Sequence, residues 1–283
     1  MYDWTGMTFG SLRDFVDRHE RLFVLTGAGC STASGIPDYR DTNGEWKRAR
    51  PVMLQNFLAD DLTRKRYWAR SLVGWQRMHA ARPNGVHHAL AALESAGRVE
   101  QLVTQNVDGL HQAAGSRNVI DLHGRIDAVR CLECGARVPR ADVQTELVRR
   151  NPRFARLDAR VAPDGDADLE DAAFAEFDVP PCRACGGRLK PDVVFFGEGV
   201  PKERVVRTAD ALERADAMLV VGSSLMVYSG YRLAVAMADA GKPIAAVNIG
   251  RTRADDRLTL KVEEDSAKAL AFLLGPGGAG GLE

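Results

Sequence analysis

The sequence predicts a doubly wound α/β fold, in which helices cover both faces of a parallel β-sheet. Several apolar runs have the length of strands and are continuous rather than alternating, which is typical of parallel strands buried on both faces. These runs alternate with segments of helical character. The chain has 283 residues, 45% of them hydrophobic, which is enough for one large domain with inserts.

The predicted strands and helices follow one another along most of the chain. The first strand, Arg21–Thr26, leads into a glycine turn. The other strands are predicted at 99–104, 118–122, 191–198, 217–222 and 243–248. Helical character is predicted for much of 41–82 and for 87–97, 201–214 and 231–240.

The glycine turn after the first strand is a candidate phosphate-binding loop. Gly27, Ala28 and Gly29 would let backbone N–H groups approach an anion, and Ser31 stands where a helix would begin. Thr32 replaces the third glycine of the usual dinucleotide fingerprint, so a tight turn without a ligand is the alternative. The continuation to Arg40 mixes Pro, Asp, an aromatic residue and Arg, which is unusual for packing alone.

Polar side chains follow the second and third predicted strands. Gln105, Asn106 and Asp108 come after 99–104, and His123 comes after 118–122. The carboxyl ends of strands in an open α/β sheet are where such folds bind ligands, so we expect these residues in one site. A structural role is expected for His87, His88 and His111.

Four of the five cysteines form two closely spaced pairs, Cys131-x2-Cys134 and Cys182-x2-Cys185. This spacing predicts one tetrahedral Zn²⁺ with four thiolate ligands, which leaves no open position and makes the metal structural. Unrelated buried cysteines are the alternative. Cys30 stands alone.

Composition excludes several classes of partner. Lys+Arg and Asp+Glu both total 38, so the net charge gives no reason to expect nucleic-acid binding. No apolar run reaches the length of a membrane span, and the N-terminus lacks the pattern of a targeting segment. We therefore expect a cytoplasmic protein, with no membrane partner, and a monomer.

Taken together, these motifs resemble the sirtuins, a family of NAD-dependent protein deacylases, over roughly Arg21 to Leu274. The resemblance rests on motifs in the family's order: 27–40, 104–108, His123-Gly124, the two cysteine pairs, 222–224 and 248–250. Further stretches resemble the class II branch, which includes the mitochondrial lipoamidase-type sirtuin: 66–70, 162–166, 189–198, 221–231 and 248–256. Departures are Cys30, where an aliphatic residue is usual, and Ser266, where the lipoamidase-type relatives carry Cys.

The resemblance implies a reaction and a set of site residues. An acyl group would pass from lysine to ADP-ribose with release of nicotinamide; His123 would be the general base, with Asn106 and Asp108 also catalytic. NAD would be bound by Gly27, Ala28, Gly29, Ser31, Ile36, Pro37, Asp38, Tyr39, Arg40, Gln105, Asn106, Val107, Asp108, Gly222, Ser223, Ser224, Asn248, Ile249, Gly250 and Ser266. An acyl-lysine protein or peptide would be bound by Tyr67, Arg70, Val194, Phe195, Phe196, Gly197, Glu198, Val227 and Tyr228.

The implied domain organisation is a Rossmann-like NAD-binding domain formed by 1–40, 83–128 and 190–283, with two inserts. The inserts are a helical module at 41–82 and a zinc-binding module with a long loop at 129–189. Tyr67 and Arg70 have the Tyr-x-x-Arg spacing that binds acidic acyl tails in the desuccinylase branch, so we expect long or carboxyl-bearing acyl groups to be preferred over acetyl. A solvent-facing or helix-capping Arg70 is the alternative. A mono-ADP-ribosyltransferase using the same NAD pocket is the alternative function, and a zinc-ribbon binding module and a dehydrogenase are disfavoured.

Overall fold

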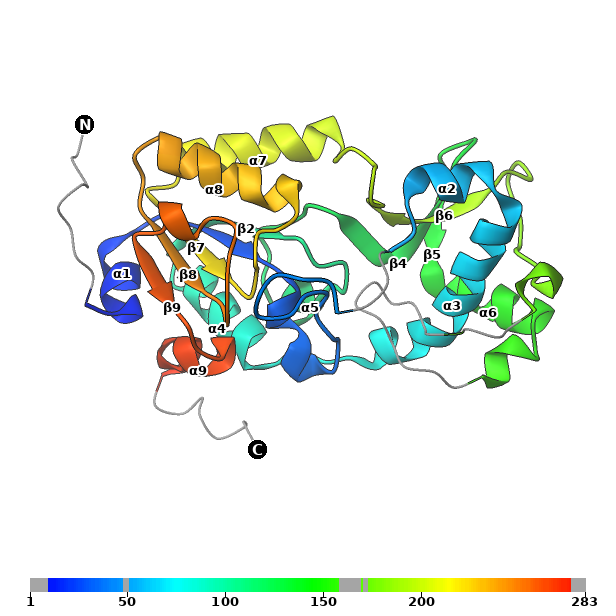
Figure 1. The fold of residues 1–283 in the computed structure, drawn as a ribbon, viewed down its shortest axis with the longest axis horizontal. Coiled ribbons are helices and arrows are strands. Elements are labelled where there is room, and N and C mark those ends of the chain that lie inside the picture. The colour runs from blue at the N-terminus through cyan, green and yellow to red at the C-terminus, as the bar shows by residue number, and fades with distance from the viewer. Residues whose placement is uncertain (1–9, 48–50, 158–168, 170–172, 276–283) are drawn as a thin grey trace.

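The computed structural model describes residues 10–47, 51–157, 169 and 173–275 (Figure 1). The stretch 162–166, part of the resemblance to the class II branch, lies outside the described residues. None of the described helices has the length and apolar character needed to cross a lipid bilayer.

The larger sheet has six parallel strands in the order β3-β2-β1-β7-β8-β9, which confirms the predicted fold class. Its strands are β1 (Leu22–Thr26), β2 (Val99–Thr104), β3 (Val119–Asp121), β7 (Ala217–Val221), β8 (Ile244–Val247) and β9 (Leu260–Val262). β9 was not predicted. It is a three-residue edge strand whose residues are all half-buried, so it lacks the continuous apolar run that marks the central strands.

Alternate residues of the central strands face two separate hydrophobic cores. In β1, Leu22 and Val24 pack with helices α1 (Leu12–Arg18), α4 (Gly85–Ser95) and α9 (Ser266–Leu270). Phe23 and Leu25 pack on the other face with α7 (Lys202–Arg214) and α8 (Tyr228–Asp239). The two helical layers lie on opposite sides of the sheet in Figure 1. Burial on both faces explains why these strands are continuous apolar runs.

A second module contains a three-stranded antiparallel sheet. Its strand order is β5-β4-β6, and its strands are β4 (Gly124–Cys131), β5 (Arg137–Pro139) and β6 (Leu189–Val193). Helices α2 (Leu54–Ala59), α3 (Asp61–Ala80) and α6 (Arg140–Arg150) complete it, with the short helices η3 (Phe154–Arg156) and η4 (Phe174–Glu176). The segment expected to continue the parallel sheet at 191–198 is strand only up to Val193, in β6, which pairs with β4 instead, and the expected boundary after residue 128 falls inside β4.

The glycine turn is not followed by the expected α-helix. Two short 3₁₀ helices, η1 (Ala28–Cys30) and η2 (Thr32–Ser34), follow β1, and Gly35 ends them in the left-handed conformation with φ 81°. Three-residue 3₁₀ turns carry little macrodipole, so this turn lacks the helix N-terminus that a dinucleotide fingerprint would supply. The remaining short helices are α5 (Leu110–Ala113), η5 (Asp255–Arg257) and η6 (Ala271–Leu274).

Candidate active site

A cavity of about 790 Å³ opens at the carboxyl ends of the parallel strands and extends to the second module. This is the position at which open α/β sheets bind ligands. Of the residues predicted for the site, the cavity wall contains Gly27, Ala28, Gly29, Asp38, Tyr39, Arg40, Tyr67, Gln105, Asn106, Val107, His123, Val194, Phe195, Phe196, Gly197, Glu198, Gly222, Ser223, Ser224, Val227, Tyr228, Asn248 and Ile249. Predicted residues that lie outside this wall are Ser31, Ile36, Pro37, Arg70, Asp108, Gly250 and Ser266.

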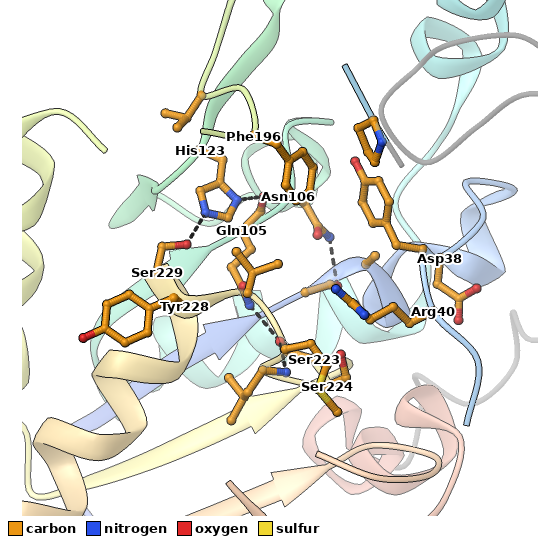
Figure 2. Close-up of a pocket in the computed structure, with 18 of the residues that line it drawn as sticks. Asp38, Arg40, Gln105, Asn106, His123, Phe196, Ser223, Ser224, Tyr228 and Ser229 are labelled. Carbon is orange, nitrogen blue, oxygen red and sulfur yellow. Dashed lines mark hydrogen bonds between the residues drawn. The ribbon is translucent and has the colours of Figure 1, made fainter. Parts of the chain in front are cut away.

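His123 is held between a backbone carbonyl and a hydroxyl group (Figure 2). Its Nδ1 lies 2.9 Å from the carbonyl oxygen of Gln105, and its Nε2 lies 2.7 Å from Oγ of Ser229. Because a carbonyl only accepts hydrogen bonds, Nδ1 carries the proton, and Nε2 presents its lone pair to the Ser229 hydroxyl. Burial lowers the pKa of His123 to about 4, partly opposed by the bond to Gln105. The imidazole is therefore neutral and able to accept a proton at Nε2.

The side-chain amide of Asn106 is oriented by two groups of the glycine turn. Its Nδ2 donates to the carbonyl oxygen of Gly27 at 3.0 Å and to Oγ of Ser31 at 3.1 Å. Both amide hydrogens are therefore used inside the protein, and Oδ1 is left to accept a hydrogen bond from a ligand. Gln105 lies beside it, with Nε2 donating to Oγ of Ser223 at 2.7 Å.

Asp108 lies behind the cavity wall. Its carboxylate accepts from Oγ of Ser31 at 2.7 Å and from the N–H of Leu110 at 2.9 Å. Burial raises the pKa of Asp108, and these hydrogen bonds and the charge of Arg125 oppose that rise. Asp108 therefore acts on the cavity through Ser31, which is hydrogen-bonded to Asn106.

The glycine turn packs closely against the loop after β7. A Cβ atom on Gly29 would lie 2.9 Å from the backbone of Gly222, so the glycine is required for this approach. The N–H groups of Gly27, Gly29, Cys30 and Ser31 donate to carbonyl oxygens of the protein. The backbone N–H groups expected to bind a phosphate are therefore largely engaged in hydrogen bonds within the protein, because carbonyl oxygens of the glycine turn and of the end of β7 accept them.

The fold and these motifs were compared with known proteins. The family model described as "Sir2 family" matches residues 27–229, which is more than half of the chain. The chain belongs to the Sir2 family. A protein named "NAD-dependent protein deacetylase 2" from Bradyrhizobium diazoefficiens is 66% identical over 264 residues, covering 93% of this chain and 97% of that protein. An "NAD-dependent protein deacetylase" from Xanthomonas campestris pv. campestris is 65% identical over 266 residues, covering 94% and 91%.

Solved Sir2 structures share the whole architecture. One described as "Sir2-p53 peptide-NAD+" superposes with a TM-score of 0.76 at 30% sequence identity, covering 96% of this chain and 99% of that one. The sirtuin resemblance is thus confirmed at the level of the family.

A loop at 38–47, after η2, forms one side of the cavity of this Sir2 protein. The guanidinium of Arg40 lies 4.0 Å from the ring centre of Trp46, and Trp46 in turn lies 5.6 Å from the ring of Phe196. The loop also passes close to the backbone of Gly250. A Cβ atom on Gly250 would lie 2.3 Å from the carbonyl oxygen of Thr42, so glycine is required for this approach. The loop thus packs against both halves of the cavity.

The segment Phe195–Glu198 is held by a nearly buried ion pair. Lys190 Nζ lies 2.9 Å from Oε2 of Glu198, and the same oxygen accepts from the N–H of Phe195 at 2.8 Å. Glu198 therefore turns its carboxylate into the protein. Gln55 also donates to the carbonyl oxygen of Gly197 at 3.1 Å, which engages one of the groups expected to pair with a peptide strand.

The apolar end of the cavity is aromatic. Tyr67 lies 5.0 Å from Phe195 and 5.5 Å from Phe57, measured between ring centres. Asp60 is the N-cap of α3, its carboxylate accepting from the N–H of Thr63, and the helix directs Tyr67 to the cavity. Arg70 is three residues further along the helix and is not among the residues that line the cavity.

The wall also contains residues that were not predicted from the sequence, among them Trp46, Ser229 and Arg232. Trp46 lies in a segment that was interpreted as helical. Ser229 and Arg232 are on α8 beside predicted residues, and Ser229 falls within the run 221–231, whose polar positions were the only signal that could have found it.

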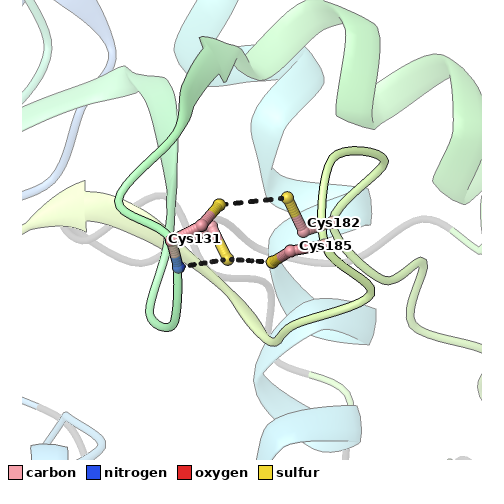
Figure 3. A group of neighbouring side chains, drawn as sticks. Cys131, Cys182 and Cys185 are labelled. Atoms are coloured by element: carbon pink, nitrogen blue, oxygen red, sulfur yellow. Dashed lines mark hydrogen bonds between the residues drawn. The ribbon is translucent and has the colours of Figure 1, made fainter.

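The four cysteines come together in two facing loops (Figure 3). Their sulfur atoms lie within 4.8 Å of one another, with Cys131 to Cys185 at 3.5 Å and Cys134 to Cys182 at 3.8 Å. A tetrahedral zinc with Zn–S bonds of about 2.3 Å requires sulfur atoms about 3.8 Å apart. The donor set and its spacing therefore fit one Zn²⁺, as predicted.

Proposed function

We propose that this Sir2-family chain is an NAD-dependent protein deacylase, which removes acyl groups from lysine side chains. The observation that carries this proposal is the neutral His123, whose Nε2 faces the cavity between polar strand ends and an apolar wall. Relatives at 65–66% identity carry the name NAD-dependent protein deacetylase, and the similar solved structure holds a peptide and NAD⁺.

The polar strand ends would hold NAD. Oδ1 of Asn106 would accept from a ribose hydroxyl or a water, and His123 would take a proton from a ribose hydroxyl at Nε2. Asp108 would hold Ser31 and Asn106 in position through its hydrogen bond with Ser31. When bound, NAD would supply the ADP-ribose group that accepts the acyl group, with nicotinamide as the leaving group. Ser223, Ser224, Asn248 and Ile249, at the ends of β7 and β8, would contact the adenosine part.

The opposite wall would receive the acyl-lysine. Tyr67, Phe195 and Phe196 supply apolar and aromatic surface, which suits a long acyl chain better than an acetyl group. We therefore propose a preference for long acyl groups, as expected for the class II branch. Arg70 is not among the residues that line the cavity, so a carboxyl-bearing acyl tail would have to extend beyond the cavity wall to reach it. The aromatic end of the cavity therefore supports a long apolar chain more directly.

Product analysis tests this proposal. The protein would be incubated with NAD and an equimolar library of acetyl-, butyryl-, octanoyl- and succinyl-lysine peptides, and all products measured by mass spectrometry. We expect free lysine peptide, nicotinamide and acyl-ADP-ribose in equal amounts. ADP-ribosylated protein or peptide without acyl-ADP-ribose would favour the alternative transferase function. A wide preference for acetyl would contradict the proposed acyl preference alone.

A matched pair of histidine variants tests the role of His123. His123→Ala should abolish turnover while the protein stays folded, because it removes the imidazole that would accept the proton at Nε2. His88→Ala, at an exposed histidine, is the control and should retain activity. Full activity in His123→Ala would remove this residue from the mechanism.

A further inference from the structure

Arg232 is a cation in the cavity wall for which the described part of the chain supplies no partner. Among the described residues it makes no hydrogen bond and no ion pair, and its Nε is buried without an acceptor. Arg40, the other arginine of this wall, donates to the carbonyl oxygen of Gly44 and lies over the ring of Trp46. Burying an N–H donor of a guanidinium without an acceptor costs free energy, so the unpaired Nε of Arg232 needs an explanation.

The acidic groups of the same wall are all engaged elsewhere. Asp38 pairs with Lys47 at 2.5 Å, and Glu198 pairs with Lys190 at 2.9 Å. The carboxylate of Asp41 accepts from two backbone N–H groups of its own loop. The described wall therefore offers Arg232 no internal counter-ion.

The surroundings of Arg232 form a distinct side of the cavity. Arg232 is three residues after Ser229 on α8, so the two side chains share a face of the helix. Val200, just before α7, and Val205, in the first turn of α7, also line the cavity. Tyr228, at the start of α8, is 66% exposed and would meet a ligand that enters here. Among the described residues, this side thus combines apolar side chains, the hydroxyl of Ser229 and the guanidinium of Arg232.

We propose that Arg232 binds a carboxylate group of the substrate and so selects among acyl-lysine sites. The proposal rests on the proposed deacylase function and names a feature of its substrate. Arg232 lies on α8 of the sheet domain, whereas the acyl end of the cavity is formed by Tyr67 and Phe195 in the second module. The carboxylate is therefore that of a Glu or Asp side chain flanking the modified lysine; an acidic acyl tail is the other source with the same chemistry. A guanidinium can bind either through two parallel N–H···O bonds.

The test uses acetyl-lysine peptides in which Glu or Gln is placed in turn at each of three positions on either side of the lysine. Both kcat/KM and the dissociation constant, by calorimetry, are measured for the wild type, Arg232→Gln and Arg232→Glu. Arg207→Gln, at an exposed arginine on α7 outside the wall, is the matched control. A second arm compares succinyl- and butyryl-lysine in a peptide without acidic residues. Melting temperatures establish that each variant is folded.

At one flanking position the wild type and Arg207→Gln should prefer Glu over Gln by about tenfold, the order expected of a charged hydrogen bond. Arg232→Gln should remove this preference and Arg232→Glu should reverse it. A change confined to the succinyl arm would place the carboxylate on the acyl tail instead. Equal preferences in wild type and both Arg232 variants, in both arms, would overturn the proposal. Absence of turnover with every peptide would contradict the deacylase function, and the dissociation constants would still decide the role of Arg232.

Discussion

The ion pair between Lys190 and Glu198 should be needed to hold the wall segment Phe195–Glu198. The side chain of Lys190 is 7% exposed and that of Glu198 is 27% exposed. Glu198→Gln would leave the ammonium with the carbonyl oxygen of Val193 and the ring of Phe195 as its described contacts. Removing one partner of a buried pair costs about 3–5 kcal/mol.

The expected magnitude is smaller than that full cost because Glu198 lies partly in solvent. We expect Glu198→Gln to lower the free energy of unfolding by about 2–3 kcal/mol, or roughly 5 °C in melting temperature for a chain of this size. Lys190→Met should cost less, about 1–2 kcal/mol, because the remaining carboxylate can turn toward water. The double variant should recover most of the loss, since no buried charge is then unpaired.

Denaturation by urea and by heat, with the zinc concentration held constant and without NAD, would measure the stability of the wild type, the two single variants and the double variant. Glu176→Gln, at an ion pair with Arg153 whose side chains are 62% and 86% exposed, is the matched control and should change stability by under about 0.5 kcal/mol. The reasoning is refuted if Glu198→Gln is as stable as the wild type, or if the losses in the two single variants simply add in the double variant.

Three further predictions concern the base, pH and zinc. Ser229→Ala should lower kcat by about 2- to 10-fold through loss of one hydrogen bond to His123, and it should move the acid limb of the kcat/KM profile to higher pH, because the hydroxyl favours the neutral imidazole; an unchanged pH profile would contradict this. Burial lowers the pKa of His87 to about 4 and of His111 to about 3, so the unfolded chain binds protons first and stability should be full above pH 6.5 and fall between pH 6.5 and 4. Urea denaturation across this pH range should show that the free energy of unfolding of His111→Gln depends less steeply on pH than that of the wild type. An equal pH dependence would contradict the role given to His111. Cys182→Ser should lose zinc and melt at a lower temperature, measured by metal analysis and calorimetry, whereas Cys30→Ala should keep its zinc.

Parts of the fold and site could be predicted because their causes are local in the sequence. β1, β7 and β8 are continuous apolar runs, and burial on both faces of a parallel sheet requires such runs. The cysteine pairs are recognisable because two ligands from one tight turn fix the spacing. His123 and Asn106 follow directly after strands, and the carboxyl ends of parallel strands bring them together.

Other features could not be predicted because they depend on contacts between distant segments. Residues 191–193 were expected in the parallel sheet, yet β6 pairs with β4, and its sequence does not encode that partner. The sequence also does not show that the carboxylate of Glu198 pairs with Lys190, or that the carboxylate of Asp108 accepts a hydrogen bond from Ser31.

The sequence by itself determined the family, the parallel sheet, the four thiolates and the identity of the candidate base, since each is written in a short run of residues. Only the tertiary structure decided the tautomer of His123, the partner of its Nε2 and the isolation of Arg232 in the wall. The physical reason is that a side chain's protonation and charge balance depend on the groups within a few ångströms of it in space, and those groups come from strands and helices far apart in the chain.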